Sequence, residues 1–486
     1  FAAALGVSQQ MLELVARTQQ PPSGSLQHLQ ALEHTGDCLK ELGQQKRADS
    51  VFQIGLTLTR NVTDIMLKKQ RMRLINSYTD CLIQMFRNSD AEKLLLENVA
   101  AADTLGASGQ EHLLITKNLL GNLYQNQGQY EKALEVHLSL VGFHQQKEPS
   151  KAPYVVAISN VGRDYYLMGD NTSAEIWTKR ALDLGRKQFP ETHPLYLTIM
   201  NNLAVIYKNL GRYPEAENLY LRTMQLRLQT LGEKHLSYAG SLNNLAVFYR
   251  QVRRYAEADT LYRKALNIYQ TASGNPNPMV ALVLSNLANT CMSLNRLEEA
   301  DSLHRLALQL RRERLGEQHP AYQMSYRNLA TLKIVQKDYD NAESMLLQSA
   351  EFYKRFDKSY DYPVVYRSLG NLAMASGNSK RVVQYWTEYA TLTNRFLAYG
   401  LPFLSEKEKT ELYANIQDDY QAMYSVLLSP QLPDSSRRRF IGLVWDKELF
   451  TKGMLLRSVR QTRQSLESSR DTVAFKTYKD WLDIRN

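Results

Sequence analysis

The sequence predicts an all-α protein: a solenoid of about nine helical hairpins, followed by a separate helical module. The phrase NNLAVIYKNLGRYPEA at residues 201–216 recurs as NNLAVFYRQVRRYAEA at residues 243–258. The alanine that ends the phrase recurs along the chain at steps of 42, 41, 42, 42, 42 and 42 residues, at Ala91, Ala133, Ala174, Ala216, Ala258, Ala300 and Ala342. A period sustained over this length is the signature of a repeat architecture.

Each repeat has the pattern of two helices. Ala204 and Tyr207 fall on one helical face, Gly211 stops that helix, and Ala216 and Tyr220 begin a second apolar stripe. Small residues allow two helices to approach closely, and aromatic residues fill the space beside them. The sequence therefore predicts a helical hairpin in every repeat.

The repeats extend outward from this central run. Ala48 precedes Ala91 by 43 residues, and Val382 follows Ala342 by 40. We therefore expect about nine hairpins of roughly 42 residues over residues 30–399, preceded by an N-terminal helical segment or cap over residues 1–29.

A different helical module is predicted for residues 400–486. Gly400 and Pro402 end the last repeat, and Ser405 with Glu408 forms a capping box that starts a new helix. The apolar positions of this module need cover, and the last hairpin of a solenoid has an open apolar face. We therefore expect the module to dock on the final repeats.

Composition excludes several classes of protein. Of the 486 residues, 44% are hydrophobic and 22% charged, which is typical of a folded, non-fibrous chain. No run approaches the 18 apolar residues of a membrane span. The three cysteines, Cys38, Cys81 and Cys291, are far apart and form no CxxC pair, so we expect no zinc site and no disulfide framework. We expect a cytoplasmic protein or one whose signal peptide has been removed.

The search for catalytic or metal-ligating residues predicts none in this chain. His193, His235 and His319 recur in phase with the repeat and mark the loop before a first helix, while His137 and His304 take an aromatic packing position. Cys291 stands where other repeats have tyrosine. Zincin, P-loop, dinucleotide-binding and GxSxG motifs are missing. We therefore expect no enzyme activity, no metal and no cofactor.

The repeats resemble the tetratricopeptide repeat family, specifically the long variety found in kinesin light chains. The phrases NNLAVFYRQVRRYAEADTLYRKALNIY and LGEKHLSYA carry the likeness. The usual repeat has about 34 residues, so each unit here is longer by about two helical turns. The resemblance implies a right-handed superhelical solenoid whose concave groove binds a protein or peptide.

One polar series recurs every 42 residues, two positions before the small residue of the first helix: Asn160, Asn202, Asn244, Asn286 and Asn328. In the repeat family this position lies on the concave wall, where a carboxamide can donate to and accept from an extended peptide backbone. The alternative is that these asparagines brace one repeat to the next, and the two roles can coexist. Four cations are expected nearby and would favour an acidic partner: Arg163, Lys208, Arg250 and Arg327.

The tail resembles the connector that joins tetratricopeptide arrays to CHAT domains, the caspase-like peptidase modules of bacteria. The phrases LPFLSEKEK, DDYQAMYSVLL and WDKELFTKGMLL carry this likeness. It implies the regulatory or sensing part of a CHAT-domain protein, with the peptidase domain further along the same polypeptide. The family's catalytic His and Cys match no residue of this chain, which has no Cys after Cys291 and no His after His319.

Two alternatives to a CHAT-protein scaffold follow from the same sequence. The first is a free-standing adaptor of the kinesin light chain type, for which the connector-like tail would have no use. The second is nucleic-acid binding, suggested by the net charge of +10. That role would need aromatic residues interleaved with arginines on one face, whereas Trp445 and Trp481 are isolated. We therefore do not expect a nucleic-acid partner.

Overall fold

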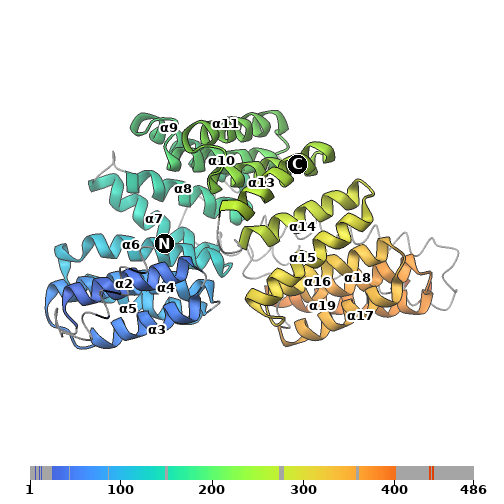
Figure 1. The fold of residues 1–486 in the computed structure, drawn as a ribbon, viewed down its shortest axis with the longest axis horizontal. Helices are drawn as coiled ribbons and strands as arrows, with labels where there is room; N and C mark the ends of the chain where they lie inside the picture. Colours follow the sequence, from blue (N-terminus) through green and yellow to red (C-terminus); the bar gives the residue numbers. More distant parts are fainter. Residues whose placement is uncertain are drawn as a thin grey trace, which may run out of the picture. The chain divides into compact units, whose positions relative to one another are not determined.

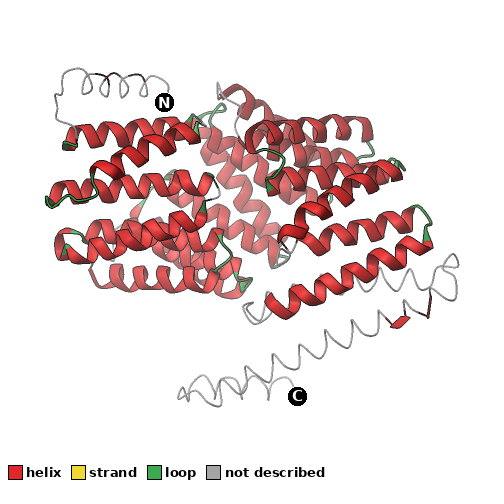
Figure 2. Ribbon diagram, turned by 90° about the horizontal axis from the view of Figure 1, so that it is seen from below, coloured by secondary structure: helices red, strands yellow, loops and turns green. Residues whose placement is uncertain are grey.

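The computed structural model describes residues 24–42, 44–85, 87–147, 152–272, 278–356 and 361–400, together with residues 6, 10, 13, 437, 438, 441 and 442. Its elements are α-helices, joined by short turns and two 3-10 turns, as Figure 2 shows. The prediction of an all-α chain is confirmed over these residues. The docking predicted for the module at residues 400–486 lies almost wholly outside the described residues.

The chain divides into two compact units. The first comprises residues 1–252 and 264–277, and the second residues 253–263 and 278–486, so that α13 (Tyr255–Ala272) contributes to both. The helices of the first unit are α2 (Leu26–Glu41), α3 (Gln45–Leu58), α4 (Ile65–Gln84), α5 (Asn88–Thr104), α6 (Gln110–Asn126), α7 (Tyr130–Lys147), α8 (Ala152–Leu167), α9 (Asn171–Gln188), α10 (Pro194–Asn209), α11 (Tyr213–Leu231) and α12 (Leu236–Gln251).

The second unit repeats the same plan. Its helices are α14 (Pro278–Ser293), α15 (Leu297–Leu315), α16 (Pro320–Val335), α17 (Tyr339–Tyr353), α18 (Asp361–Ala375) and α19 (Ser379–Gly400). Within each unit a first helix packs against the second helix of its own hairpin, and that second helix packs against the first helix of the next hairpin. Figure 1 shows this succession in chain order, from α2 to α11 and from α14 to α19.

Local sequence explains where the first helices begin. His193, His235 and His319 are the N-cap residues of α10, α12 and α16, and the Nδ1 atom of each accepts a hydrogen bond from the backbone amide two residues on, at 2.9–3.2 Å. Pro194 and Pro320 follow two of these caps and begin their helices, where the missing amide hydrogen costs nothing. The predicted structural role of these three histidines is confirmed.

The turn inside a hairpin uses a residue with positive φ. In the hairpins of α10 and α11 this is Gly211, at φ +74°, and in those of α16 and α17 it is Lys337, at φ +63°. Only glycine adopts this region without a steric cost. The turn is therefore fixed by the packing of the helices, even where the sequence supplies no glycine.

The core of each unit follows the predicted period. The seven alanines that define the repeat are all 0% exposed. At two of the repeats the small residue is glycine and the residue opposite carries a large ring: Gly121 lies against His137, and Gly370 lies against the indole of Trp386. A methyl group added at either glycine would overlap that ring. The helix pairs thus approach as closely as the repeat pattern predicts.

None of the helices in the described part of the chain combines the length and hydropathy needed to cross a membrane.

Candidate peptide-binding face

The predicted asparagine series lies on the first helices of the hairpins. We call the surface that carries Asn160 on α8, Asn202 on α10 and Asn244 on α12 the asparagine face. All three side chains are half-buried, so that part of each carboxamide is reachable. In the second unit, Asn286 and Asn328 take the corresponding positions on α14 and α16 and are also half-buried.

Two of the asparagines bond to the preceding repeat. Asn160 Nδ2 donates to Asn118 Oδ1 at 2.8 Å, and Asn244 Nδ2 donates to Asn201 Oδ1 at 2.9 Å. The repeat aligns Asn160 with Leu119 and Asn244 with Asn202 in the preceding repeat. Each acceptor, Asn118 or Asn201, therefore lies one residue before the aligned position. Asn202 makes no hydrogen bond to another described residue. The bracing role is therefore real at two positions and leaves Asn202 available.

Lys208 and Arg250 bring two like charges together on this part of the first unit. Both are half-buried on α10 and α12. Burial, followed by the positive charge of Arg250, lowers the pKa of the Lys208 ammonium below its ordinary value. The Arg250 Nε atom is buried and has no acceptor, and no described carboxylate lies within ion-pair distance of either cation. The pair is thus held at an electrostatic cost.

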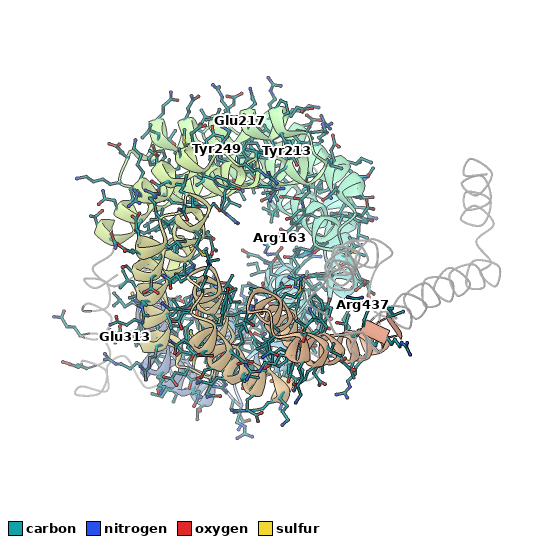
Figure 3. The ribbon with its side chains drawn as sticks, turned by 90° about the vertical axis from the view of Figure 1, so that its right-hand side faces the viewer. Arg163, Tyr213, Glu217, Tyr249, Glu313 and Arg437 are labelled. Carbon is teal, nitrogen blue, oxygen red and sulfur yellow. The ribbon has the colours of Figure 1, made fainter. Side chains whose placement is uncertain are left out.

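Contacts between repeats balance charged groups elsewhere in this unit. Arg212 Nη1 lies 2.8 Å from Glu175 Oε1, and its guanidinium stacks 4.1 Å from the centre of the Tyr207 ring. The Tyr249 hydroxyl similarly donates to Glu217 at 2.9 Å, and both residues are labelled in Figure 3. Lys208 and Arg250 differ from this arrangement, because each lies near another cation and not near a carboxylate.

The other two predicted cations differ from each other. Arg163, on α8, is exposed and forms no ion pair with another described residue. Figure 3 shows it on the opposite side of the helices from Tyr213 and Glu217. Arg327, on α16 in the second unit, is instead paired with Asp361 at 3.0 Å. Its charge is therefore already balanced within the protein.

Family models match this part of the chain. Two models, each described as "Tetratricopeptide repeat", match residues 154–229, 195–271 and 279–355, and residues 118–146. The chain contains tetratricopeptide repeats. Arrays of such repeats use extended surfaces to bind other proteins, so this chain is a scaffold for protein–protein interaction.

Several solved structures are similar to this chain in fold. The kinesin light chain nearly identical TPR-like repeats of Podosopora anserina are 22% identical and cover 44% of this chain and 99% of their own, with a TM-score of 0.39. BtubC from P. vanneervenii is 21% identical over 49% of this chain and 94% of its own, with a TM-score of 0.41. The quorum sensor NprR from B. thuringiensis is 17% identical over 75% and 97%, with a TM-score of 0.48. No curated protein matches the chain.

A buried polar cluster joins three helices of the first tetratricopeptide repeats. His137 Nδ1 lies 2.6 Å from Asp164 Oδ2, and Gln125 Nε2 donates to Asp164 Oδ1 at 2.5 Å. His137 and Asp164 are both 0% exposed. Sequence reasoning identified His137 as a packing residue but missed Asp164. Asp164 could have been recognised from the repeat, because the two following repeats have the apolar residues Ile206 and Phe248 at its position. A charged residue at an otherwise apolar position indicates a buried polar contact.

The remaining candidates for chemistry are sealed within the tetratricopeptide repeats. His304 is 0% exposed, and burial lowers its pKa to about 4. Cys291 is also 0% exposed, and burial raises the pKa of its thiol to about 11, which leaves little of the reactive thiolate at neutral pH. Among the described residues, no group of three or more His, Cys, Asp and Glu side chains could hold a metal ion.

Proposed function

We propose that the asparagine face binds an extended, acidic segment of a partner protein, and that the chain is the regulatory scaffold of a CHAT-type, caspase-like protease. The observation that carries the binding proposal is the like-charged pair of Lys208 and Arg250. Two half-buried cations with no described counter-ion do not stabilise a fold, because desolvation and mutual repulsion both oppose the charged state. A carboxylate from a partner would offset both the desolvation and the repulsion of the two cations.

The asparagines fit a main-chain ligand. First helices of neighbouring hairpins stack at about 10 Å, the ordinary helix-packing distance, and about three residues of extended chain span that interval. Asn202 would contact the backbone of the ligand with both its donor and its acceptor. Asn160 and Asn244 each use one donor for the preceding repeat and keep the second amide hydrogen. Such a ladder holds a peptide without reading its sequence.

The link to a protease is supported by the connector-like phrases after residue 400 alone. A free-standing kinesin light chain-like adaptor is the alternative. Reading the coding frame past Asn486 distinguishes the two. About 300 further residues of alternating strands and helices, with one His and one Cys in reach of each other, would support the protease scaffold. A stop codon directly after Asn486 would contradict it and favour the adaptor.

The substitution Lys208→Met tests the binding proposal. It removes a charge that the fold disfavours while keeping the aliphatic stem. We expect the melting temperature to rise and the affinity for a fluorescein-labelled deca-glutamate peptide, measured by fluorescence anisotropy, to fall about tenfold, which corresponds to about 1.4 kcal/mol. Raising the salt concentration should weaken the peptide binding of the unmodified protein.

The matched control is Lys234→Met, at an exposed lysine in the loop before α12. It should change neither the melting temperature nor the affinity. If Lys208→Met instead lowers the melting temperature and leaves peptide affinity unchanged, Lys208 has a structural role and the proposed site is wrong.

A further inference from the structure

A shallow groove, distinct from the asparagine face, lies on the first unit. It is bordered by the end of α7, the start of α8 and α9. Its volume is about 640 Å³, within the range of roughly 300–1,000 Å³ that is usual for ligand sites. Its walls include Tyr154, Ile176, Lys179, Arg180, Leu184 and Lys187. Five of these six residues come from α9, and their spacing of three, one, four and three residues places them on one face of that helix.

The groove has an exposed apolar end. Ile176 is 62% exposed, more than any other large hydrophobic residue in the described part of the chain. Leu184, two turns further along α9, is half-buried beside the ring of Tyr154. A single exposed isoleucine is ordinary on a protein surface, but this one continues into a groove that holds further apolar side chains.

Arg180 is held in position with no carboxylate partner among the described residues. Its Nη2 atom donates to the Tyr154 hydroxyl at 2.8 Å, and its guanidinium stacks 5.2 Å from the centre of the Trp177 ring. In the next repeat, Arg222 takes the corresponding place on α11 and is neutralised by Glu191 at 2.7 Å. Arg180 is therefore oriented by neutral groups, which leaves its charge for a ligand and reduces the side-chain entropy lost on binding.

The groove is cationic overall. Lys179, Arg180 and Lys187 line it against one acidic residue, Asp183. Lys179 is paired with Glu175 at 2.5 Å, whereas Lys187 has no ion pair within the described part of the chain. Two positive charges, those of Arg180 and Lys187, thus stand about two turns apart on α9, with the apolar surface of Leu184 between them.

We propose that this groove binds an acidic amphipathic helix of a partner protein. The stripe from Ile176 to Lys187 extends over roughly 16 Å of α9, which three turns of a partner helix would match. Apolar side chains of that helix would cover Ile176 and Leu184, and its carboxylates would pair with Arg180 and Lys187. The groove uses the second helix of a hairpin and is separate from the asparagine face, so one unit of the scaffold could hold two partners at once.

The test uses a synthetic 14-residue peptide, acetylated and amidated, with leucine on one helical face and glutamate on the other. Its binding to the 486-residue chain is measured by fluorescence anisotropy. We expect Lys187→Glu, at an exposed position, to weaken binding at least tenfold, and Arg180→Ala to weaken it similarly. The matched control is Arg222→Ala, at the corresponding but neutralised arginine, which should change the affinity less than twofold.

Two further measurements make the outcome decisive. A peptide with lysine in place of glutamate should not bind. Lys208→Met should leave the affinity for the acidic helical peptide unchanged, because Lys208 lies on α10 and does not line the groove. Loss of binding in Lys208→Met but not in Lys187→Glu would overturn the groove proposal and place the peptide beside Lys208. Absence of binding, or equal binding of the lysine peptide, would also overturn it.

Discussion

Two successive junctions between hairpins of the first unit are built from opposite chemistry. At the junction of α6, α7 and α8, the residues Gln125, His137 and Asp164 form a hydrogen-bonded cluster that water does not reach. At the junction of α9, α10 and α11, Glu175 and Arg212 form an ion pair at the surface. The helices repeat the same plan, yet one junction depends on a fully buried carboxylate and the other on a half-buried carboxylate paired with a more exposed arginine.

The two junctions show that the contacts between hairpins can differ in chemistry while the fold of the repeat stays the same. The spacing of small and aromatic residues fixes the helix hairpins, and the remaining contacts between hairpins can be made by different groups. The energetic consequences are unequal, because a buried charge that loses its partner remains desolvated, whereas an exposed charge is taken up by water.

The largest effect is expected for Asp164→Ala. The substitution leaves the polar atoms of His137 and Gln125 buried without their partner, and breaking such a buried contact costs about 3–5 kcal/mol. Urea unfolding followed by circular dichroism measures the change. Asp183→Ala, at an exposed aspartate on α9, is the control and should stay within about 0.5 kcal/mol. A loss below 1 kcal/mol at Asp164 would mean that water reaches the cluster.

The same comparison can be sharpened with a paired replacement. Combining Asp164→Ile with His137→Thr copies Ile206 and Thr178, which take the corresponding positions at the next junction, into the earlier one. Replacing a buried polar pair by apolar residues of similar volume is often neutral for stability. We therefore expect the double variant to recover most of the stability lost in Asp164→Ala. A double variant as unstable as Asp164→Ala would show that the cluster is required for packing at this junction.

A smaller loss is expected for Gly121→Ala. The added methyl group overlaps the imidazole of His137, which cannot move without breaking its contact with Asp164. Overpacking of this kind costs about 1–3 kcal/mol. Gly142→Ala, at an exposed helical glycine with open space around it, is the control and should stabilise the chain slightly. Equal melting temperatures for the two variants would contradict the close approach of α6 and α7.

The smallest effect is expected for Glu175→Gln, at most about 1 kcal/mol. Burial alone would raise the pKa of the Glu175 carboxyl, but hydrogen bonds from Lys179 and Arg212 outweigh it and lower the pKa. A lowered pKa in the folded state gives stability that is present above the unfolded value of about 4.3 and is lost as the pH falls below it. The stability difference between the unmodified chain and Glu175→Gln should therefore shrink between pH 6 and pH 3. A difference that grows on acidification would contradict this sign.

The fold could be predicted largely from the sequence because the same pattern of small and aromatic residues recurs in each repeat. The periodic alanines, the hairpin glycine at Gly211 and the capping role of His193 all follow from local spacing. Positive φ at Lys337 could not be foreseen, since nothing in the residue itself favours that region. There the packing of α16 against α17 decides the turn.

The candidate site was harder to predict because it depends on contacts between repeats. Asn244 bonds to Asn201 and not to Asn202, the residue one repeat earlier. The sequence spacing does not reveal this shift, because it depends on how α10 and α12 lie against each other. The partner of Arg327, Asp361, lies 34 residues further along the chain at the start of another helix. By contrast, the proximity of Lys208 and Arg250 follows from their separation of 42 residues, one full repeat.

The pattern of contacts between neighbouring helices also affects how the chain folds. The principal helix contacts within each unit join consecutive helices or helices one apart. Chain segments that meet are therefore close in sequence, which shortens the loops that must close and favours rapid folding. Folding can begin at any hairpin and spread to its neighbours. Amide hydrogen exchange should accordingly be fastest in α2 and α3 at the end of the first unit and slowest in its middle hairpins, with protection rising step by step along the stack.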